Sequence, residues 1–185
     1  MNHLRNLQLD EIAILRSQAC RADDWNQVWV PEMFDIEYVN HVRFSGTVQL
    51  GAFRKVFTLP GGLVKHSGLR HVTLHNCTLG DNVLIENVQN YIANYRIGDD
   101  CFIQNINVML VEGKATFGNN VEVSVLNETG GREVPIYDGL SASLAYIIAL
   151  YRHRPVLIKH LRDMITAYTE GIAYTEGIVG DRVKI

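Results

Sequence analysis

The feature that most constrains the fold is an internal repeat. Three segments align with one another, namely LGDNVLIENV (79–88), IGDDCFIQNI (97–106) and FGNNVEVSVL (117–126). They start eighteen and then twenty residues apart, which is three hexapeptides, stretched once by two residues around Gly113. An amphipathic helix needs a period of 3.6 residues and a hairpin strand a period of two, so neither reproduces this pattern.

Within the repeat, the hexads read from Ser67 place large apolar residues at the first position and compact ones at the fifth. The first positions include Leu79, Ile85, Tyr91, Ile97 and Ile103, and the fifth positions include Cys77, Val83 and Cys101. A parallel β-helix explains this spacing, because each hexad supplies one short strand and one corner and three hexads close a triangular coil. We therefore expect short parallel strands over most of residues 42–126.

Residues one coil apart should stack on each other. This predicts that Leu79 and Ile97 lie one above the other in the core. It also predicts an outward corner ladder in which side-chain amides hydrogen-bond along the axis, with a glycine before each rung because the corner needs an unusual backbone conformation. The rungs are Asn82, Asp100 and Asn120, and the glycines are Gly80, Gly98 and Gly118.

The flanking segments complete the expected domain organisation. Asp10 is a candidate N-cap for a helix through EIAILRSQAC, and apolar residues at helical spacing follow Leu140 and again follow Pro155. Val179-Gly180-Asp181 repeats the form of Leu79-Gly80-Asp81, as if a coil of a longer protein were starting. The fold class is therefore mainly β: a left-handed parallel β-helix of hexapeptide repeats with an N-terminal helical cap and a C-terminal helical hairpin. The expected parts are a cap (1–39), the β-helix (40–126), a loop and helical hairpin insertion (127–178) and a further coil (179–185).

Composition and charge exclude several classes of function. A net charge of −3 and a pI near 6.1 give no basic field for nucleic acid or an acidic membrane surface. No apolar run reaches membrane-spanning length and the start lacks a signal-peptide pattern, which predicts a cytoplasmic protein. The three cysteines, Cys20, Cys77 and Cys101, have no metal-type spacing, so we expect buried thiols and no metal site.

The hexads resemble the [LIV]-G-x-x-x-x repeat of the bacterial transferase hexapeptide superfamily. The stretches NVLIENVQNYIANYRIGDD, VLNETGGREVPIYDGLS and AYIIALYRHRP are also similar to the amino-terminal region of a bacterial family of unknown function, sometimes labelled as related to UDP-N-acetylglucosamine pyrophosphorylase. The resemblance covers residues 9–183 and implies longer family members. It implies acyl transfer from acetyl-CoA to a sugar or nucleotide sugar, and assembly as a homotrimer with sites between subunits. No pyrophosphorylase-type glycine-rich nucleotide loop occurs in the chain.

His75 is the candidate catalytic residue. Acyltransferases of this superfamily commonly use a histidine on an outer coil or loop to deprotonate the acceptor, and neutral imidazole is a base near physiological pH. His66, His71 and His75 fall in early coils, and His75 sits at an outward corner in the hexad register. The alternative interpretation is a surface histidine without a function, because no motif ties His75 to this role.

Two further stretches are candidates for ligand binding. Arg152 and Arg154 belong to the basic run RHRPVLIKHLR, where guanidinium groups would hold phosphates; the alternative is a solvated helix face. The loop NETGGRE lies where the stack should end, so its backbone N–H groups, polar side chains and guanidinium could line a concave site. Its candidate residues are Asn127, Glu128, Gly130, Gly131 and Arg132. The alternative is that the glycines only turn the chain and that Arg132 pairs with a neighbouring glutamate.

Two functions from different classes follow from these observations. The first is a transferase that acts on a sugar or nucleotide sugar by acyl transfer. The second is a non-catalytic β-helix scaffold or oligomerisation module whose partner domain carries the chemistry. Thermal stabilisation by acetyl-CoA or UDP sugars would distinguish them, since a ligand that binds only the folded state raises its stability.

Overall fold

The computed structural model describes residues 3–124 and 130–185. It divides into two compact units, residues 1–112 with 176–185 and residues 113–175, and each is described by itself. Within the described residues, no helix combines the length and the apolar character that crossing a membrane requires.

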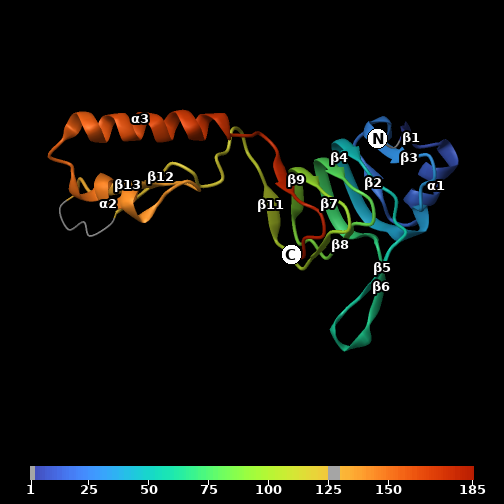
Figure 1. Cartoon of the computed structure of the whole chain (residues 1–185). Helices are drawn as coiled ribbons and strands as arrows, with labels where there is room; N and C mark the ends of the chain where they lie inside the picture. The colour runs from blue at the N-terminus through green and yellow to red at the C-terminus, as the bar shows by residue number, and fades with distance from the viewer. Residues whose placement is uncertain (1–2, 125–129) are drawn as a thin grey trace. The chain divides into compact units, whose positions relative to one another are not determined.

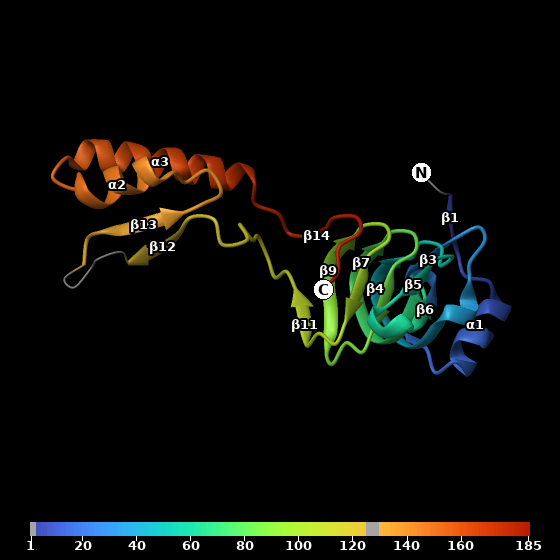
Figure 2. The same ribbon diagram turned by 60° about the horizontal axis from the view of Figure 1, so that its bottom comes forward.

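The first unit is mainly β, and its sheet is mostly parallel. Strands β4, β7 and β9 run side by side through the unit, and the short strands extend the pairing from them (Figures 1 and 2). Its ten strands are β1 (Leu4–Asn6), β2 (Arg21–Ala22), β3 (Val28–Pro31), β4 (Val39–Gln49), β7 (Gly68–Leu79), β8 (Leu84–Glu86), β9 (Tyr91–Ile97), β10 (Phe102–Gln104), β11 (Val108–Leu110) and β14 (Gly177–Val179). Only the β1–β3 pair is antiparallel within this sheet.

An antiparallel hairpin leaves this sheet between β4 and β7. It consists of β5 (Val56–Thr58) and β6 (Val64–His66) and projects away from the stacked strands in Figure 1. The 3-10 turn η3 (Pro60–Gly62) forms its tip, and two further 3-10 turns, η1 (Trp25–Gln27) and η2 (Ile36–Tyr38), lie nearer the N-terminus. Its base is held by the buried Glu86, which pairs with Lys65 of β6 and lies 3.9 Å from the Arg70 guanidinium.

The eighteen-residue repeat appears directly in the strand register. Leu79 pairs with Ile97 across β7 and β9, and Ile85 pairs with Ile103 across β8 and β10. The predicted stacking of Leu79 on Ile97 is therefore confirmed. All four side chains belong to the buried core, so the eighteen-residue repeat stacks apolar side chains of neighbouring layers on each other inside the unit.

The prediction that 117–126 forms a third parallel repeat is wrong for residues 117–124, which the structure describes. Strand β12 (Val121–Ser124) pairs antiparallel with β13 (Glu133–Ile136) instead of joining the parallel sheet. The backbone N–H of Asn120 donates to the Ile136 carbonyl at 2.7 Å, so Asn120 is not a rung of the predicted ladder. FGNN imitates a hexad in its letters, but here it belongs to a turn closed by Thr116 and Asn119.

The parallel stack continues with the last residues of the sequence. Val179 of β14 pairs with Ile97, and the backbone N–H of Asp99 donates to Asp181 Oδ1 at 2.9 Å. Asp99 in turn accepts from the Asp81 N–H at 2.7 Å, so carboxylates link successive layers. Arg182, with φ of 60°, follows Asp181 as Asp100 follows Asp99 and takes the corner position that we predicted for Asn120.

The glycines before these corners have another role than the one predicted. Gly80 and Gly98 do not adopt a left-handed backbone; that conformation falls on Asn82 and Asp100, with φ of 60° and 59°. A Cβ at Gly80 would lie 2.3 Å from Asp99 Oδ1, and one at Gly98 would lie 2.3 Å from Asp181 Oδ1. Glycine is therefore needed for close approach of the neighbouring layer.

The N-terminal segment is not only a helical cap, because it contributes β1, β2 and β3 as well as helix α1 (Leu9–Ser17). The helix begins before Asp10, which lies in its first turn, so Asp10 is not the N-cap. Glu11 closes the helix start by accepting the Gln8 backbone N–H at 2.8 Å. Leu15 is fully buried, and its contact with the core fixes the helix against the strands.

In the second unit, the two expected helices are α2 (Ala142–Leu150) and α3 (Pro155–Gly171). Ser141 caps α2 by accepting the Leu144 N–H at 3.2 Å, and Pro155 occupies the first turn of α3, where its missing N–H costs nothing. Val134 of β13, Ile148 of α2 and Ile165 of α3 form a separate buried core.

Candidate functional site

The outer face of β4 and β7 carries the polar residues that gather in the first unit. The two strands are parallel and pair Arg43 with Thr73 and Ser45 with His75. Their alternate residues, Val42, Phe44, Val72 and Leu74, are buried, so a period of two separates the core face from the outer face. The outer side chains of the two strands therefore form a row that a ligand can contact from the solvent.

His75 faces a cavity of about 490 Å³ on this row. Strands β4, β7, β9 and β11 all contribute to it, together with the carboxylate that follows β11. The lining residues are Arg43, Ser45, Thr73, His75, Tyr91, Ala93, Asn94, Leu110 and Glu112. The half-exposed Tyr91 and Leu110 give this cavity an apolar wall beside the imidazole.

The His75 ring is held by both of its nitrogens. Nδ1 lies 2.9 Å from Ser45 Oγ, and Nε2 lies 3.0 Å from the Asn76 Nδ2 amide. Asn76 is oriented by its own oxygen, which accepts the Thr47 backbone N–H at 3.1 Å. Because Asn76 presents an N–H to Nε2, the ring proton of neutral His75 is on Nδ1 and is donated to Ser45.

Asp23 completes a chain of hydrogen bonds behind the histidine. A hydrogen bond from the Ser45 hydroxyl, and after it one from the Arg43 guanidinium, lowers the pKa of Asp23 below its ordinary value. Arg43 Nη2 lies 3.2 Å from Asp23 Oδ1. Asp23 is therefore a carboxylate at neutral pH and accepts from Ser45, which accepts from His75 Nδ1. The order Asp23–Ser45–His75 fixes the tautomer that exposes Nε2 as the basic atom.

The structure places His75 differently from the predicted corner. It lies inside β7, and the corner residue is Asn76, with φ of 50°. The sequence alone gave no reason to assign a catalytic role to Ser45 or Asp23. Ser45 and His75 are 30 residues apart, which is not a multiple of eighteen because the β5–β6 hairpin intervenes. Of the other two early histidines, His66 is stacked on the Tyr38 ring with 3.6 Å between centroids, and His71 is stacked on His41.

The other predicted ligand-binding residues lie in the second unit. Arg152 Nη1 donates to the Gly130 carbonyl at 3.2 Å, and the Gly131 N–H donates to Glu133 Oε1 at 3.0 Å. Arg132 is half-buried, and Arg154 is exposed at the N-cap of α3. The structure thus brings Arg152 to the glycine pair. Asn127 and Glu128 lie outside the described residues, and a ligand site in this loop stays a prediction.

The cysteines offer no activated nucleophile to either region. Cys20, Cys77 and Cys101 are free and buried, as predicted, and burial raises the pKa of each thiol. Across residues 3–124 and 130–185, no three His, Cys, Asp or Glu side chains are grouped so as to hold a metal ion.

A family described as a domain of unknown function, DUF4954, matches residues 4–185. The chain belongs to this family. This DUF4954 chain is 27% identical over 171 residues to an uncharacterized protein of Treponema pallidum (strain Nichols), and the alignment covers 86% of the chain and 24% of that protein. It thus spans about a quarter of the length of this curated relative. No solved structure matches the DUF4954 chain.

Proposed function

We propose that the first unit is a left-handed parallel β-helix of the transferase hexapeptide type, and that it transfers an acyl group to a sugar or nucleotide sugar. The eighteen-residue register of β7 to β10 supports the β-helix. Left-handed corner residues one layer apart, such as Asn87 and Asn105, support it further, since each layer turns at equivalent positions.

The observation that carries the acyl-transfer proposal is the hydrogen-bonded chain from Asp23 through Ser45 to His75. It orients the imidazole of His75, which lines a cavity together with polar side chains and the apolar Tyr91 and Leu110. An imidazole in one fixed tautomer, with a carboxylate behind it, is the arrangement that a general base needs. The intervening hydroxyl passes the electrostatic support of Asp23 to the ring.

The proposed reaction uses His75 Nε2 as the atom that moves the proton. The imidazole takes the proton of the acceptor hydroxyl or amine while the oxygen or nitrogen of that group attacks the carbonyl carbon of the acetyl-CoA thioester. The carbon–sulfur bond then breaks, and the imidazolium gives the proton to the leaving thiolate, so His75 ends as it began. Asp23 stabilises the imidazolium between the two transfers through Ser45.

Asn76 must release His75 during this cycle, because its Nδ2 occupies the lone pair of Nε2. The acceptor hydroxyl replaces this amide at little net cost, because one hydrogen bond to Nε2 is traded for another of similar quality. Asn76 is exposed, so its side chain can rotate away from His75, and this rotation also changes its contacts to Thr47 and Asn94.

The test is release of free thiol from acetyl-CoA by the full chain, with and without UDP-linked amino sugars. His75→Gln should lower the acceptor-dependent rate by roughly a hundredfold or more, the usual contribution of a general base. Asp23→Asn should cause a smaller loss. His153→Gln is the matched control, because His153 is exposed and belongs to the second unit. Equal rates for the His75 and His153 variants would refute the proposal.

A non-catalytic oligomeric scaffold is the second candidate. The observation that favours it is the exposure of apolar side chains on β11 and β14, where Val108, Leu110 and Ile178 are 46%, 41% and 61% exposed. Such residues are buried when copies of a chain associate, for example as the trimer that the hexapeptide resemblance implies. Light scattering of the full chain tests this: a concentration-independent monomer with no acetyl-CoA binding would leave neither candidate standing.

A further inference from the structure

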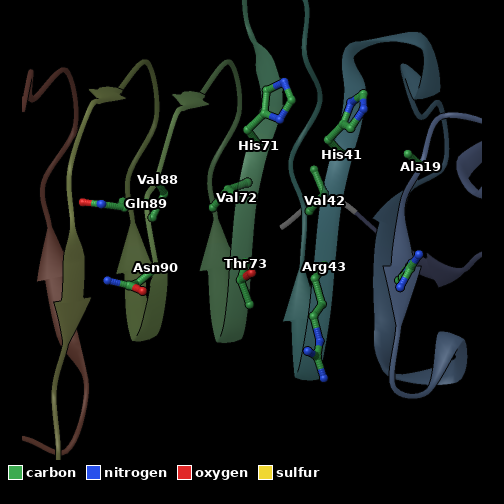
Figure 3. Close-up of a pocket in the computed structure, with 11 residues that line it drawn as sticks. Ala19, His41, Val42, Arg43, His71, Val72, Thr73, Val88, Gln89 and Asn90 are labelled. Carbon is green, nitrogen blue, oxygen red and sulfur yellow. The ribbon is translucent and has the colours of Figure 1, made fainter.

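A second cavity adjoins the first along the same strands. It has a volume of about 250 Å³ and lies around the outer side chains at the beginning of β4 and β7 (Figure 3). Its lining residues are Ala19, Arg21, His41, Val42, Arg43, His71, Val72, Thr73, Val88, Gln89 and Asn90. None of them is an aspartate or a glutamate, whereas four are arginine or histidine.

The two arginines of this cavity lie next to each other on neighbouring strands. Arg21 of β2 is the direct register partner of Arg43 of β4, and both are exposed. Like charges opposite each other on neighbouring strands destabilise a sheet unless an anion lies between them. Arg43 is partly compensated by Asp23 at 3.2 Å, but Arg21 has no ion-pair partner within residues 3–124 and 130–185.

Two histidines line the same cavity as the arginines. The His41 and His71 rings are stacked with centroids 4.5 Å apart, and Figure 3 shows them side by side at the same end of β4 and β7. Both residues have a left-handed backbone, with φ of 55° and 52°. Asparagine supplies this conformation at many other corners of the described chain, so the turn itself does not require an imidazole.

We propose that this cavity binds the phosphate group of the substrate, held by Arg21 and Arg43 and by the imidazoles of His41 and His71. Two guanidinium groups offer paired N–H donors that match phosphate oxygens. Thr73, Gln89 and Asn90 add neutral hydrogen-bond donors to the lining. The charge of a bound phosphate removes the repulsion between the two arginines.

The position of this anion site defines the substrate class of the neighbouring catalytic site, and this step rests on the proposed function. Arg43 and Thr73 line both cavities, so a ligand can occupy the two at once. With the phosphate at His41 and His71, the remainder of the substrate extends along β4 and β7 towards His75. The substrate is therefore a phosphate-bearing one, such as a sugar phosphate or a nucleotide sugar.

The experiment measures sulfate and pyrophosphate binding to the full chain through the imidazole nitrogen signals of its histidines in NMR spectra. We expect sulfate and pyrophosphate to shift the signals of His41 and His71, whose side chains line the cavity.

Three variants test the assignment against one matched control. Arg21→Gln should weaken sulfate affinity roughly tenfold, the worth of one charge-assisted contact. His41→Asn and His71→Asn should weaken sulfate binding while keeping the corners, because asparagine accepts this backbone conformation. Arg96→Gln removes one exposed guanidinium that lines neither cavity and should leave binding unchanged. Folding of each variant is checked by its thermal transition.

The outcomes separate this proposal from the catalytic one. Sulfate and pyrophosphate binding that is the same in wild-type and Arg21→Gln chains, or that Arg96→Gln weakens equally, overturns the anion site. His75→Gln should bind sulfate as the wild type does, because His75 does not line this cavity. Anion binding without any acetyl-CoA turnover would refute acyl transfer and leave the anion site in place.

Discussion

Replacing Ile97 with alanine tests whether the stacked columns hold the first unit together. Ile97 is 1% exposed and lies between Leu79 of one layer and Val179 of the next. The change deletes three buried carbon atoms, worth about 0.8 kcal/mol each in transfer from water, and leaves a cavity that the two neighbouring layers cannot fill. We expect a loss of about 3–4 kcal/mol in the free energy of unfolding.

Urea unfolding followed by tryptophan fluorescence measures this loss specifically. Trp25 and Trp29 are the two tryptophans of the chain and both lie in the first unit, so their signal reports that unit alone. With a slope of about 2 kcal/mol/M, the midpoint should fall by about 1.5–2 M urea. Ile178→Ala is the control, because Ile178 is 61% exposed, and its effect should stay within about 0.5 kcal/mol. Similar midpoint shifts for the two variants would contradict the stacking account.

Three further predictions concern charge and thiols. Glu86→Gln should destabilise the first unit by about 3 kcal/mol in the same urea assay, because Lys65 and Arg70 lose the buried carboxylate between them. The control Asp163→Asn breaks an exposed ion pair with Lys159 and should cost less than about 0.5 kcal/mol. The hydrogen bond from Lys55 lowers the pKa of Asp100 in the folded state. The Asp100 carboxylate therefore stabilises the fold at a pH above its unfolded-state pKa of about 3.9, and this contribution is lost as the pH falls through its lower folded-state pKa. Acid titration of the wild type and of Asp100→Asn should therefore converge at low pH, and curves that stay parallel would contradict this. The three cysteines should react with a thiol reagent only as fast as the unit unfolds, and rapid labelling of the native chain would show that they are accessible.

The parallel stack was predictable because equal spacing puts equivalent residues on top of each other. Leu79 with Ile97 and Ile85 with Ile103 occupy the same register, and a core column needs similar side chains in each layer. Prediction failed at 117–126, because four letters of a hexad fit a hairpin turn equally well. The continuation of the stack at Val179 was visible as a motif, and the helical spacing after Leu140 indicated an insertion at 127–178. The hexad-like letters of 117–126 hid that the second unit already begins at Gly113.

The candidate site was less predictable because its members do not share the repeat spacing. His75 could be predicted from the sequence as a base at an outer position. Its partners could not, because they depend on how β4 pairs with β7 and how β2 pairs with β4. Ser45 reaches it through the 30-residue offset between β4 and β7, and Asp23 follows β2, which pairs with β4. The hairpin β5–β6 lies within that offset, and its length is set by its own pairing rather than by the hexads.

Polar side chains differ between layers spaced by eighteen residues and the pair β4–β7, which has an offset of 30 residues. Where the spacing is eighteen residues, the corner and loop positions carry asparagines and aspartates that bond the next layer, as Asn87 bonds Asn105 and Asp81 bonds Asp99. Those side chains are occupied by the stack itself. Between β4 and β7, the offset of 30 residues brings histidine, arginine and serine onto one outer face instead, and Arg21 has no ion-pair partner in the described chain. Side chains such as Asn76 and Asp81 also bond across this longer offset, so the polar residues of this outer face that line the two cavities are the ones we expect to bind a ligand.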